Sequence, residues 1–565
     1  MSKIFLSKTL PLILLGGLLL TGLVTIFTQS GQYGIKVDEP IQDSYGHAVM
    51  EWYYTLGRDT SFLTAFPADT YMPEHGGIFD AGIAAVQHAF PPADHWQVRR
   101  IITALAGLLG LVAIALCGYE MGGYWMAFLA ALMLWLYPRY YGAIYNNPKD
   151  IPATVTTTLV LWGALLLLKQ WGQEKRYLRN SLLVGFFIGL AASIRVTAVI
   201  WYAIFVLVVL GWWFLRGREV RREHRVRAEL SKQGISALVI GLSSWLTMIV
   251  LWPYVFLNPV VNLLRSIKVL SKYPWDGSVL YNGALVAATK LPRIYSLEWL
   301  VIGSPPTLVL FALLGLGIVG VVSVRKRLID PQVAVVILSL LVPLGAMIGL
   351  HSVLYNALRQ FLFLIPSMIL LAVYGLVQMV QYLRGRKQRV LRLAAVGLAV
   401  LILASYVQVI NDMANLSPFE YTYFSPFVGG LAGAARNFET DYWATCSEQA
   451  AIWLAQNYQH YTNSSAPSVE AGANQDQISP FLAPKFHRDS VNSDFYIVPI
   501  GVPIDPKYKT IHTIGMRGAI FCLIKVNSTI THHEALPGKN VVITGKPATG
   551  IPDVKMLQQA FIGSK

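Results

Sequence analysis

The sequence predicts a polytopic α-helical membrane protein of about eleven transmembrane helices, followed by a small α/β domain outside the membrane. Three observations lead to this fold class. Of the 565 residues, 55% are hydrophobic and only 13% are charged, against about 25% charged residues in soluble domains. Apolar runs long enough to cross a bilayer recur along the chain. After residue 412 the composition becomes polar. These observations exclude a soluble multi-domain enzyme.

The apolar runs also predict the orientation of the chain. Strongly basic segments such as 216–227 separate several of the runs. Lys and Arg gather in cytoplasmic loops, so we expect a cytoplasmic N-terminus, an extracytoplasmic C-terminal domain and a place in the plasma (inner) membrane. The predicted spans are 10–28, 100–117, 124–137, 152–169, 181–194, 197–215, 236–256, 303–324, 331–350, 359–381 and 392–411.

Two alternatives concern charge and the first run. The net charge of +15 could indicate a nucleic-acid partner, but the basic residues lie in the gaps between spans and no nucleic-acid-binding motif is present. We therefore expect no nucleic acid. The first run could be a cleaved signal peptide. Its 18 apolar residues from Leu10 to Phe27, with no clear small-x-small site before Gln29, favour a retained helix.

The chain divides into two predicted domains. Residues 1–412 form the membrane module, including a long outer loop, 29–99, with two amphipathic stretches that predict helices on the membrane surface. Residues 413–565 form the outer domain, with a helix near 447–458 and three strand-like runs. Segment 463–480 is predicted to be a flexible loop. Cys446 and Cys522 both lie in the outer domain, where an oxidising compartment would allow, but does not require, a disulfide.

Adjacent carboxylates, Asp38 and Glu39, open the long outer loop. Ionisable groups at a lipid surface are costly unless they are solvated or functional. Transfer of a sugar needs a base that takes the proton of an acceptor hydroxyl, and one carboxylate of such a pair could serve. The alternative is a solvated pair in a loop that Pro40 ends.

A second polar cluster lies at 140–152, at the outer end of the third predicted span. It brings Asn146, Asn147, Lys149 and Asp150 to the same face of the membrane as Asp38. An acid beside a base suits a site that handles a phosphate next to a reacting sugar. For Asp150 alone, the alternative is a residue at the start of the fourth span that stabilises the helix N-terminus.

Three arginines, Arg195, Arg293 and Arg359, lie at the outer side. Guanidinium groups bind phosphate oxygens in bidentate fashion, and a lipid phosphate would supply the anion. The alternatives are snorkelling or pairing with an acid. His75, with Asp80 five residues on, matches no metal-site spacing. No metal ligand is assigned, a divalent metal cofactor is left open, and His75 is expected to shape the acceptor side of a pocket.

Together these motifs resemble the GT-C superfamily of polyprenyl-phosphate-dependent glycosyltransferases. The nearest likeness is to the protein O-mannosyltransferase and lipid A aminoarabinose transferase group, in its bacterial phospholipid-carrier-dependent branch. The likeness rests on four segments: the Asp-Glu pair, NPKD at 147–150, YNALRQFLFLIP at 355–366, and 419–443. It covers about residues 1–445. The tail beyond does not resemble the sugar-binding repeat domain of the eukaryotic O-mannosyltransferases.

The resemblance implies a GT-C fold and a donor sugar carried on a polyprenyl phosphate. It implies an inverting transfer to a lipid, glycan or protein acceptor at the outer face. The implied catalytic residues are Asp38 as base, Glu39 and Asp150. The implied substrate-binding residues are Lys149, Asn147, Arg195, Arg293, Tyr355, Arg359 and His75.

Two other functions compete with glycosyl transfer. A secondary transporter or lipid flippase would show matched halves and charges in the span centres, whereas this sequence has no internal repeat. An assembly scaffold would use the outer domain to bind partners. The tail could instead cap the pocket or recruit the acceptor, because Glu439, Asp441, Tyr442 and Trp443 follow the last span closely.

Overall fold

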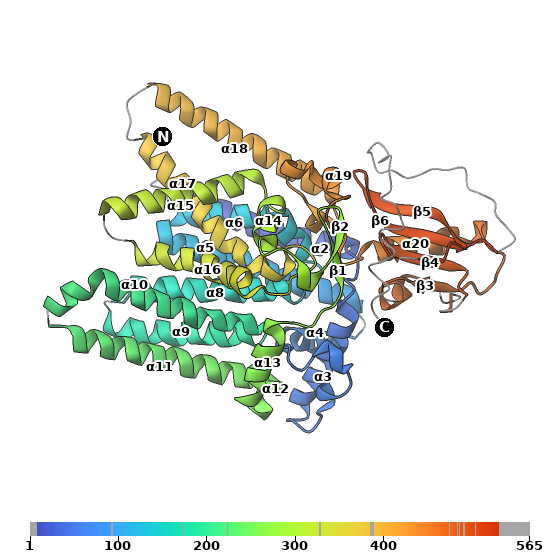
Figure 1. The fold of residues 1–565 in the computed structure, drawn as a ribbon, viewed down its shortest axis with the longest axis horizontal. Coiled ribbons are helices and arrows are strands. Elements are labelled where there is room, and N and C mark those ends of the chain that lie inside the picture. The colour runs from blue at the N-terminus through green and yellow to red at the C-terminus, as the bar shows by residue number, and fades with distance from the viewer. Residues whose placement is uncertain are drawn as a thin grey trace.

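The computed structural model describes residues 8–529 except 92–93, 172, 223, 327–328, 385–388, 474, 483, 485, 490–491 and 503. Long helices lie side by side in one bundle, and a sheet domain stands at one end of it (Figure 1). The C-terminal ends of α10, α15 and α17 lie at the opposite end of the bundle (Figure 1). Basic residues occur at or directly after these three helix ends, and the helix ends lie away from the sheet domain.

Each predicted span falls on a helix, but the helix that holds the predicted span 181–194, α9, is not among the described helices that are apolar enough to cross a membrane. Within the described residues, eight helices are long and apolar enough to cross a membrane, and two apolar helical segments, in α6 and α18, are shorter. The chain is therefore a multi-pass membrane protein, as predicted. The helices are α2 (Thr9–Gln29), α5 (His95–Gly122), α6 (Tyr124–Trp135), α8 (Asp150–Lys169), α9 (Glu174–Ala192), α10 (Ile200–Arg222), α11 (Val226–Leu251), α15 (Pro306–Lys326), α16 (Pro331–Leu350), α17 (Ile365–Arg384), which follows the 3₁₀ segment Arg359–Leu364, and α18 (Arg389–Leu416).

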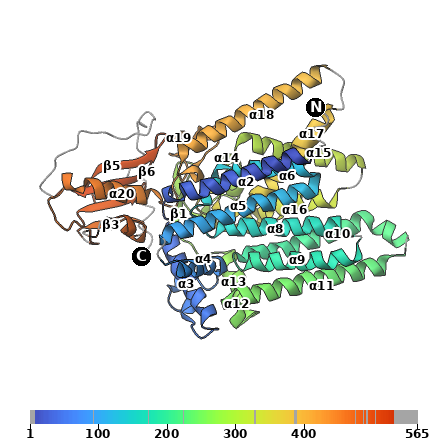
Figure 2. The same cartoon turned by 180° about the vertical axis from the view of Figure 1, so that it is seen from behind.

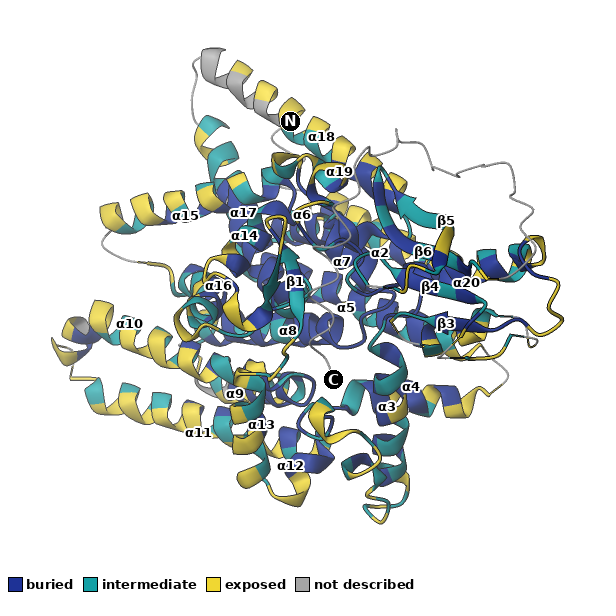
Figure 3. Cartoon of the chain, turned by 45° about the vertical axis from the view of Figure 1, so that its right-hand side comes forward, coloured by how far each residue is buried: buried dark blue, intermediate teal, exposed yellow. Residues whose placement is uncertain are grey.

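Apolar side chains cover both the inside and the outside of the bundle. Phe214 of α10 is 87% exposed and Leu310 of α15 is 59% exposed, and exposed residues line the outward faces of α10, α11 and α15 (Figure 3). Exposed apolar residues along so many helices suit contact with lipid rather than water. On one side of the bundle, α2 packs along α5 and α6 (Figure 2). A Cβ on Gly375 of α17 would lie 2.7 Å from the backbone nitrogen of Gly315 of α15, so glycine permits this close helix contact.

The shorter elements gather at the end of the bundle that carries the sheet domain. The outer loop forms α3 (Glu39–Tyr54) and α4 (Ile78–Ala89), which confirms its two predicted helices. Between α11 and α15 lie α12 (Pro253–Leu257), α13 (Val261–Ser271), the hairpin β1 (Ser278–Tyr281) and β2 (Ala284–Ala287), and α14 (Tyr295–Ile302). The helix α7 (Pro138–Ala143) precedes α8.

The sheet domain follows α18. After α19 (Gly430–Ala434), the helix α20 (Cys446–Asn457) packs against a sheet of order β3-β4-β6-β5, in which only β3–β4 is parallel. The strands are β3 (Val469–Ala471), β4 (Phe495–Pro499), β5 (Tyr508–Met516) and β6 (Ala519–Asn527). The predicted helix and all three predicted strands are thus confirmed, and Cys446 and Cys522 form a disulfide between α20 and β6.

Two parts of the predicted outer domain need comment. The segment 463–480 is not wholly a loop, because its residues Val469–Ala471 form β3 and pair with β4. This strand is only three residues long and joins the sheet at its edge, and Ser, Ala and Pro dominate the sequence around it, so no periodicity reveals it. Residues 530–565 lie outside the described residues.

Candidate active site

A cavity of about 1180 Å³ lies between the ends of the membrane helices, the outer loop and the sheet domain. Seven of the ten predicted site residues line it: Asp38, His75, Lys149, Asp150, Arg195, Tyr355 and Arg359. These residues come from five separate segments of the chain. The sheet domain supplies a further wall, made largely of small and apolar residues: Gly472, Ala473, Pro499, Ile500, Gly501, Val502, Gly518, Ala519 and Ile520.

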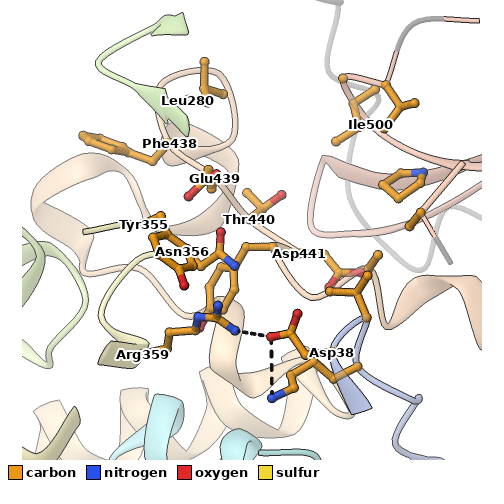
Figure 4. A pocket seen from close by; sticks show the side chains of 18 of the residues that line it. Asp38, Leu280, Tyr355, Asn356, Arg359, Phe438, Glu439, Thr440, Asp441 and Ile500 are labelled. Carbon is orange, nitrogen blue, oxygen red and sulfur yellow. Dashed lines mark hydrogen bonds and ion pairs between the residues drawn. The ribbon is translucent and has the colours of Figure 1, made fainter. Parts of the chain in front are cut away.

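Asp38 stands directly before α3, and its carboxylate is held by cations. Its side chain makes no hydrogen bond to the helix N-terminus. Instead the Nη1 atom of Arg359 donates to Asp38 Oδ2 over 2.7 Å, and Lys36 Nζ lies 3.9 Å from the same oxygen (Figure 4). Desolvation raises the pKa of Asp38, but the charges of Arg359 and Lys36 outweigh it and lower that pKa to about 2. Asp38 is therefore ionised at neutral pH.

Asp150 is the second carboxylate of the cavity, and Asn147 fixes it in place. The Asn147 Nδ2 atom donates to Asp150 Oδ2 over 2.9 Å, and Asn147 Oδ1 accepts the backbone N–H of Asp150 over 3.0 Å. The guanidinium of Arg195, at the end of α9, forms an ion pair with Asp150 Oδ1. Asn147 is fully buried and does not line the cavity, so its contribution is to position Asp150.

Cations outnumber carboxylates in this part of the cavity. Lys36, Lys149, Arg195 and Arg359 face Asp38 and Asp150, which leaves an excess of two positive charges. Lys149 is 8% exposed and forms no ion pair with the described carboxylates. Burial lowers the pKa of Lys149 to about 8; the charge of Asp80 opposes this shift and the charge of Arg195 adds to it. A buried excess of positive charge is a site for an anion.

Glu39 is turned away from the cavity. Its Oε2 accepts the backbone N–H of Lys36 over 2.8 Å, and its Oε1 lies 3.4 Å from the Nε atom of Arg99. Arg99 of α5 is completely buried and also pairs with Asp43 of α3 and Asp80 of α4, at 3.3 and 2.5 Å. One arginine therefore joins three helices below Asp38, and Glu39 belongs to this support rather than to the cavity wall.

Arg293 lies outside the cluster as well. It is exposed in the segment before α14 and does not line the cavity.

His75 lines the cavity, and its ring centroid lies 5.9 Å from that of Tyr273. Burial, with the charges of Lys149 and Arg195, holds the pKa of His75 well below its ordinary value, so this imidazole is neutral at pH 7. A neutral imidazole can donate or accept a hydrogen bond to a hydroxyl.

A glycine fixes the loop that carries His75. A Cβ on Gly76 would lie 1.7 Å from the backbone oxygen of Ser193, next to Arg195. Gly76→Ala is therefore expected to destabilise the protein by about 1–3 kcal/mol through overpacking and to displace His75 from the cavity. Thermal unfolding and ligand binding of the purified variant would measure both effects. Gly82→Ala, in the following helix α4, is the control, because nothing lies within 4 Å of a Cβ at this position. Equal effects of the two variants would contradict the prediction.

Sequence reasoning missed several residues of the cavity. Lys36 precedes Asp38 by two positions, and Tyr273, Trp275, Leu280 and Leu285 come from the segment around the β1–β2 hairpin. A signal for the hairpin was present: Asn282 and Gly283 both have positive φ, 50° and 78°, and an Asn-Gly pair between two apolar runs is typical of a two-residue hairpin turn.

The segment after α19 closes the cavity. Glu439, Asp441 and Tyr442 line it, whereas Trp443 is buried. Figure 4 shows Glu439 and Thr440 above Asn356 and Tyr355. Burial raises the pKa of Glu439 to about 8, although the charge of Arg359 opposes that shift. Glu439 is therefore mostly protonated at pH 7 and adds little negative charge to the site.

No metal centre is assigned. Among the described residues, no group of three or more His, Cys, Asp or Glu is arranged to hold a metal ion. Asp80, which follows His75 in sequence, is bound to Arg99 instead.

Comparisons with known proteins bear on the fold. No protein-family model and no curated protein matches the sequence. The apo crystal structure of the Archaeoglobus fulgidus oligosaccharyltransferase is 13% identical, with a TM-score of 0.50, over 86% of this chain and 61% of that chain. Oligosaccharyltransferase AglB from the same organism, in complex with an inhibitory peptide and a dolichol-phosphate, is 12% identical, with a TM-score of 0.52. The match covers 87% of this chain and 70% of that chain.

The chain has a GT-C fold. The chain thus spans about three fifths of the length of the apo oligosaccharyltransferase. ArnT from Cupriavidus metallidurans bound to undecaprenyl phosphate is 13% identical, with a TM-score of 0.46, over 93% of this chain and all of that chain. The predicted fold class is confirmed, and in this GT-C fold the cavity lies where the outer loop meets the bundle.

Proposed function

We propose that this protein is an inverting membrane glycosyltransferase that moves a sugar from a polyprenyl phosphate to an acceptor hydroxyl on the outer face. One observation carries the proposal. A single cavity at the end of the membrane helices holds an ionised carboxylate, Asp38, beside an excess of buried cations. The cations suit the donor phosphate and Asp38 suits the acceptor proton. The GT-C fold supports this reading, because the oligosaccharyltransferase AglB with that fold binds a dolichol-phosphate.

The reaction is one displacement at the anomeric carbon. Asp38 takes the proton of the acceptor hydroxyl while the acceptor oxygen attacks that carbon from the face opposite the phosphate. The bond between the carbon and the phosphate oxygen breaks, and its electron pair stays on the phosphate. Lys36, Lys149, Arg195 and Arg359 stabilise the charge that develops on the departing phosphate. The products are a glycosylated acceptor and the bare polyprenyl phosphate.

Donor binding is coupled to the strength of the base. The Arg359 guanidinium holds Asp38 ionised but weakly basic. A phosphate bound beside Arg359 competes for that guanidinium and adds a negative charge close to Asp38. Both effects raise the pKa of Asp38 toward the range in which a carboxylate is an effective base. Asp38 would thus gain basicity only when a donor is in place.

The proposal includes an orientation for the chain. We propose a place in the plasma (inner) membrane, with the N-terminus and the basic loops in the cytoplasm, because Lys and Arg mark the cytoplasmic side. The cavity then opens on the outer side. A polyprenyl chain is too apolar to leave the bilayer, so the protein can bind its sugar only at this interface.

The proposal is tested with purified protein in lipid vesicles. The protein is given polyprenyl phosphates that carry different sugars, together with an extract of cell-envelope acceptors. Mass spectrometry should detect bare polyprenyl phosphate and a glycosylated product that are absent without protein. Movement of intact donor across the vesicle, with no loss of its sugar, would favour a flippase and overturn the proposal.

Donor affinity is expected to depend on pH through Lys149. Its ammonium is charged below a pKa of about 8 and neutral above it. Donor affinity should therefore be constant near pH 7 and fall about tenfold above pH 8, as one charge-assisted contact is lost. Lys149→Arg should remove the fall, because a guanidinium stays charged. Equilibrium binding from pH 6 to 10 measures this; an equal fall in the Lys149→Arg variant would assign the titration to Glu439 or another group.

A further inference from the structure

A wall of aromatic side chains stands beside the charged cluster, and the proposed reaction leaves it unused. Tyr273, Trp275 and Tyr355 all line the cavity and are half-buried. The ring centroids of Trp275 and Tyr355 lie 4.3 Å apart and nearly parallel, at 27°. Tyr273 lies 6.4 Å from Tyr355. These three residues are called the aromatic wall below.

The aromatic wall is anchored to the cluster by Arg359. The guanidinium carbon of Arg359 lies 5.1 Å from the centre of the Tyr355 ring, and the same guanidinium pairs with Asp38. Figure 4 shows Tyr355 and Asn356 next to Arg359. A group joined to a phosphate at Arg359 by a single oxygen would therefore lie against Tyr355, within reach of Asp38.

The backbone directly after Tyr355 has an unusual conformation. The next two residues, Asn356 and Ala357, have φ values of 55° and 62°, in the left-handed region that non-glycine residues seldom adopt. Such strain costs of order 1–3 kcal/mol per residue and persists only where surrounding contacts impose it. Here Ala357 N–H donates to Tyr295 Oη over 3.2 Å, and Tyr355 N–H donates to Gln360 Oε1 over 3.3 Å. The loop is thus constrained to present Tyr355 to the cavity.

Polar groups surround the wall. His75 lies 5.9 Å from Tyr273, and Asn356 and Glu439 line the same cavity. An aromatic surface bordered by a few hydrogen-bonding groups suits a ligand with an apolar face and a polar edge. A sugar ring is such a ligand, because its C–H bonds form an apolar face and its hydroxyl groups form the edge.

We propose that the aromatic wall is the subsite for the sugar ring of the donor, with Trp275, held by its stacking on Tyr355, against the C–H face of the ring and His75, Asn356 and Glu439 at its hydroxyl groups. This inference rests on the proposed function. The donor sugar is assigned in preference to an acceptor sugar, because the wall adjoins the cation that pairs with Asp38. Ile500 of the sheet-domain wall lies apart from Tyr355 and Arg359 (Figure 4), and this wall is left for the acceptor.

The test compares two ligands that differ only in the sugar: a polyprenyl phosphate that carries one and the bare polyprenyl phosphate. Trp275→Ala and Tyr355→Ala should weaken binding of the glycosylated lipid by roughly 2- to 10-fold, the size of one stacking contact. Trp275→Ala should bind the bare lipid as the wild type does. Trp275→Phe should restore most of the affinity. Trp453→Ala is the control, since Trp453 stacks on His512 outside the cavity and should change neither affinity.

The outcomes separate this inference from the function on which it rests. An equal loss of affinity for both lipids, or no loss for either, would overturn the sugar subsite without contradicting the proposed glycosyltransferase function. A weaker affinity for the acceptor alone would reassign the wall to the acceptor and also overturn the inference. A wild-type protein that binds neither lipid would overturn the proposed function itself.

Discussion

Replacing Asp38 with asparagine is expected to lower the rate of sugar transfer by about 100- to 10,000-fold, the usual contribution of a general base. The carboxamide has nearly the same shape but cannot take the acceptor proton. Donor binding should be retained or tightened, because the change removes a negative charge that now neutralises Arg359. Single-turnover rates at saturating donor, measured beside equilibrium donor binding, would separate the two effects.

The control for this prediction is Asp69→Asn, which makes the same chemical change at an exposed position of the same outer loop. It should leave both the rate and the affinity unchanged. If Asp38→Asn kept most of the wild-type rate, Asp38 would not be the base, and the proposed mechanism would fail. Thermal unfolding of both variants would show that any loss of rate is not a loss of fold.

Replacing Arg359 with glutamine is expected to weaken binding of bare polyprenyl phosphate by about 10- to 100-fold, the range for a hydrogen bond to a charged group. Arg359 Nη1 donates to Asp38, and Arg359 Nε is buried without a hydrogen-bond partner among the described residues. A phosphate can accept from both nitrogens. Arg359→Lys should recover only part of the affinity, because an ammonium lacks the planar fork. Isothermal binding in lipid nanodiscs would measure these losses.

Arg293→Gln provides the comparison for Arg359. It removes an arginine at the same end of the bundle that is exposed and does not line the cavity, so the affinity should not change. An equal loss in the two variants would mean that the lipid phosphate responds to overall surface charge, and would contradict a specific site at Arg359.

The membrane module could be predicted closely from the sequence, because a bilayer imposes one strong rule. Every span must be helical, apolar and about 20 residues long, and each predicted run became a helix. Sidedness then brought Asp38, Asp150 and Arg359 to one end of the bundle, although 321 positions separate Asp38 from Arg359 in the chain. Topology alone therefore predicted which distant residues meet.

The direction of individual side chains could not be predicted in the same way. Glu39 follows Asp38, yet successive residues at a helix start point about 100° apart, and Glu39 faces Arg99 while Asp38 faces Arg359. Asn147 supports Asp150 from behind for a similar reason. Which residues of the sheet domain line the cavity depends on how that domain packs on the bundle. No local sequence pattern encodes that packing. The sequence likewise gave no reason to expect the contact between Trp275 and Tyr355, because they lie 80 positions apart on separate loops.

The state of the three cysteines makes this chain suited to labelling of introduced cysteines with thiol reagents. Two of them are joined between α20 and β6, and the third, Cys117, is buried in α5. No accessible sulfhydryl remains within residues 8–529, so no native cysteine has to be removed before a reporter is attached. A cysteine introduced into the α10–α11 connection, or into the exposed part of the outer loop, would react alone with a maleimide that cannot cross the bilayer. Comparing intact with opened cells would then show directly on which side each end of the bundle lies.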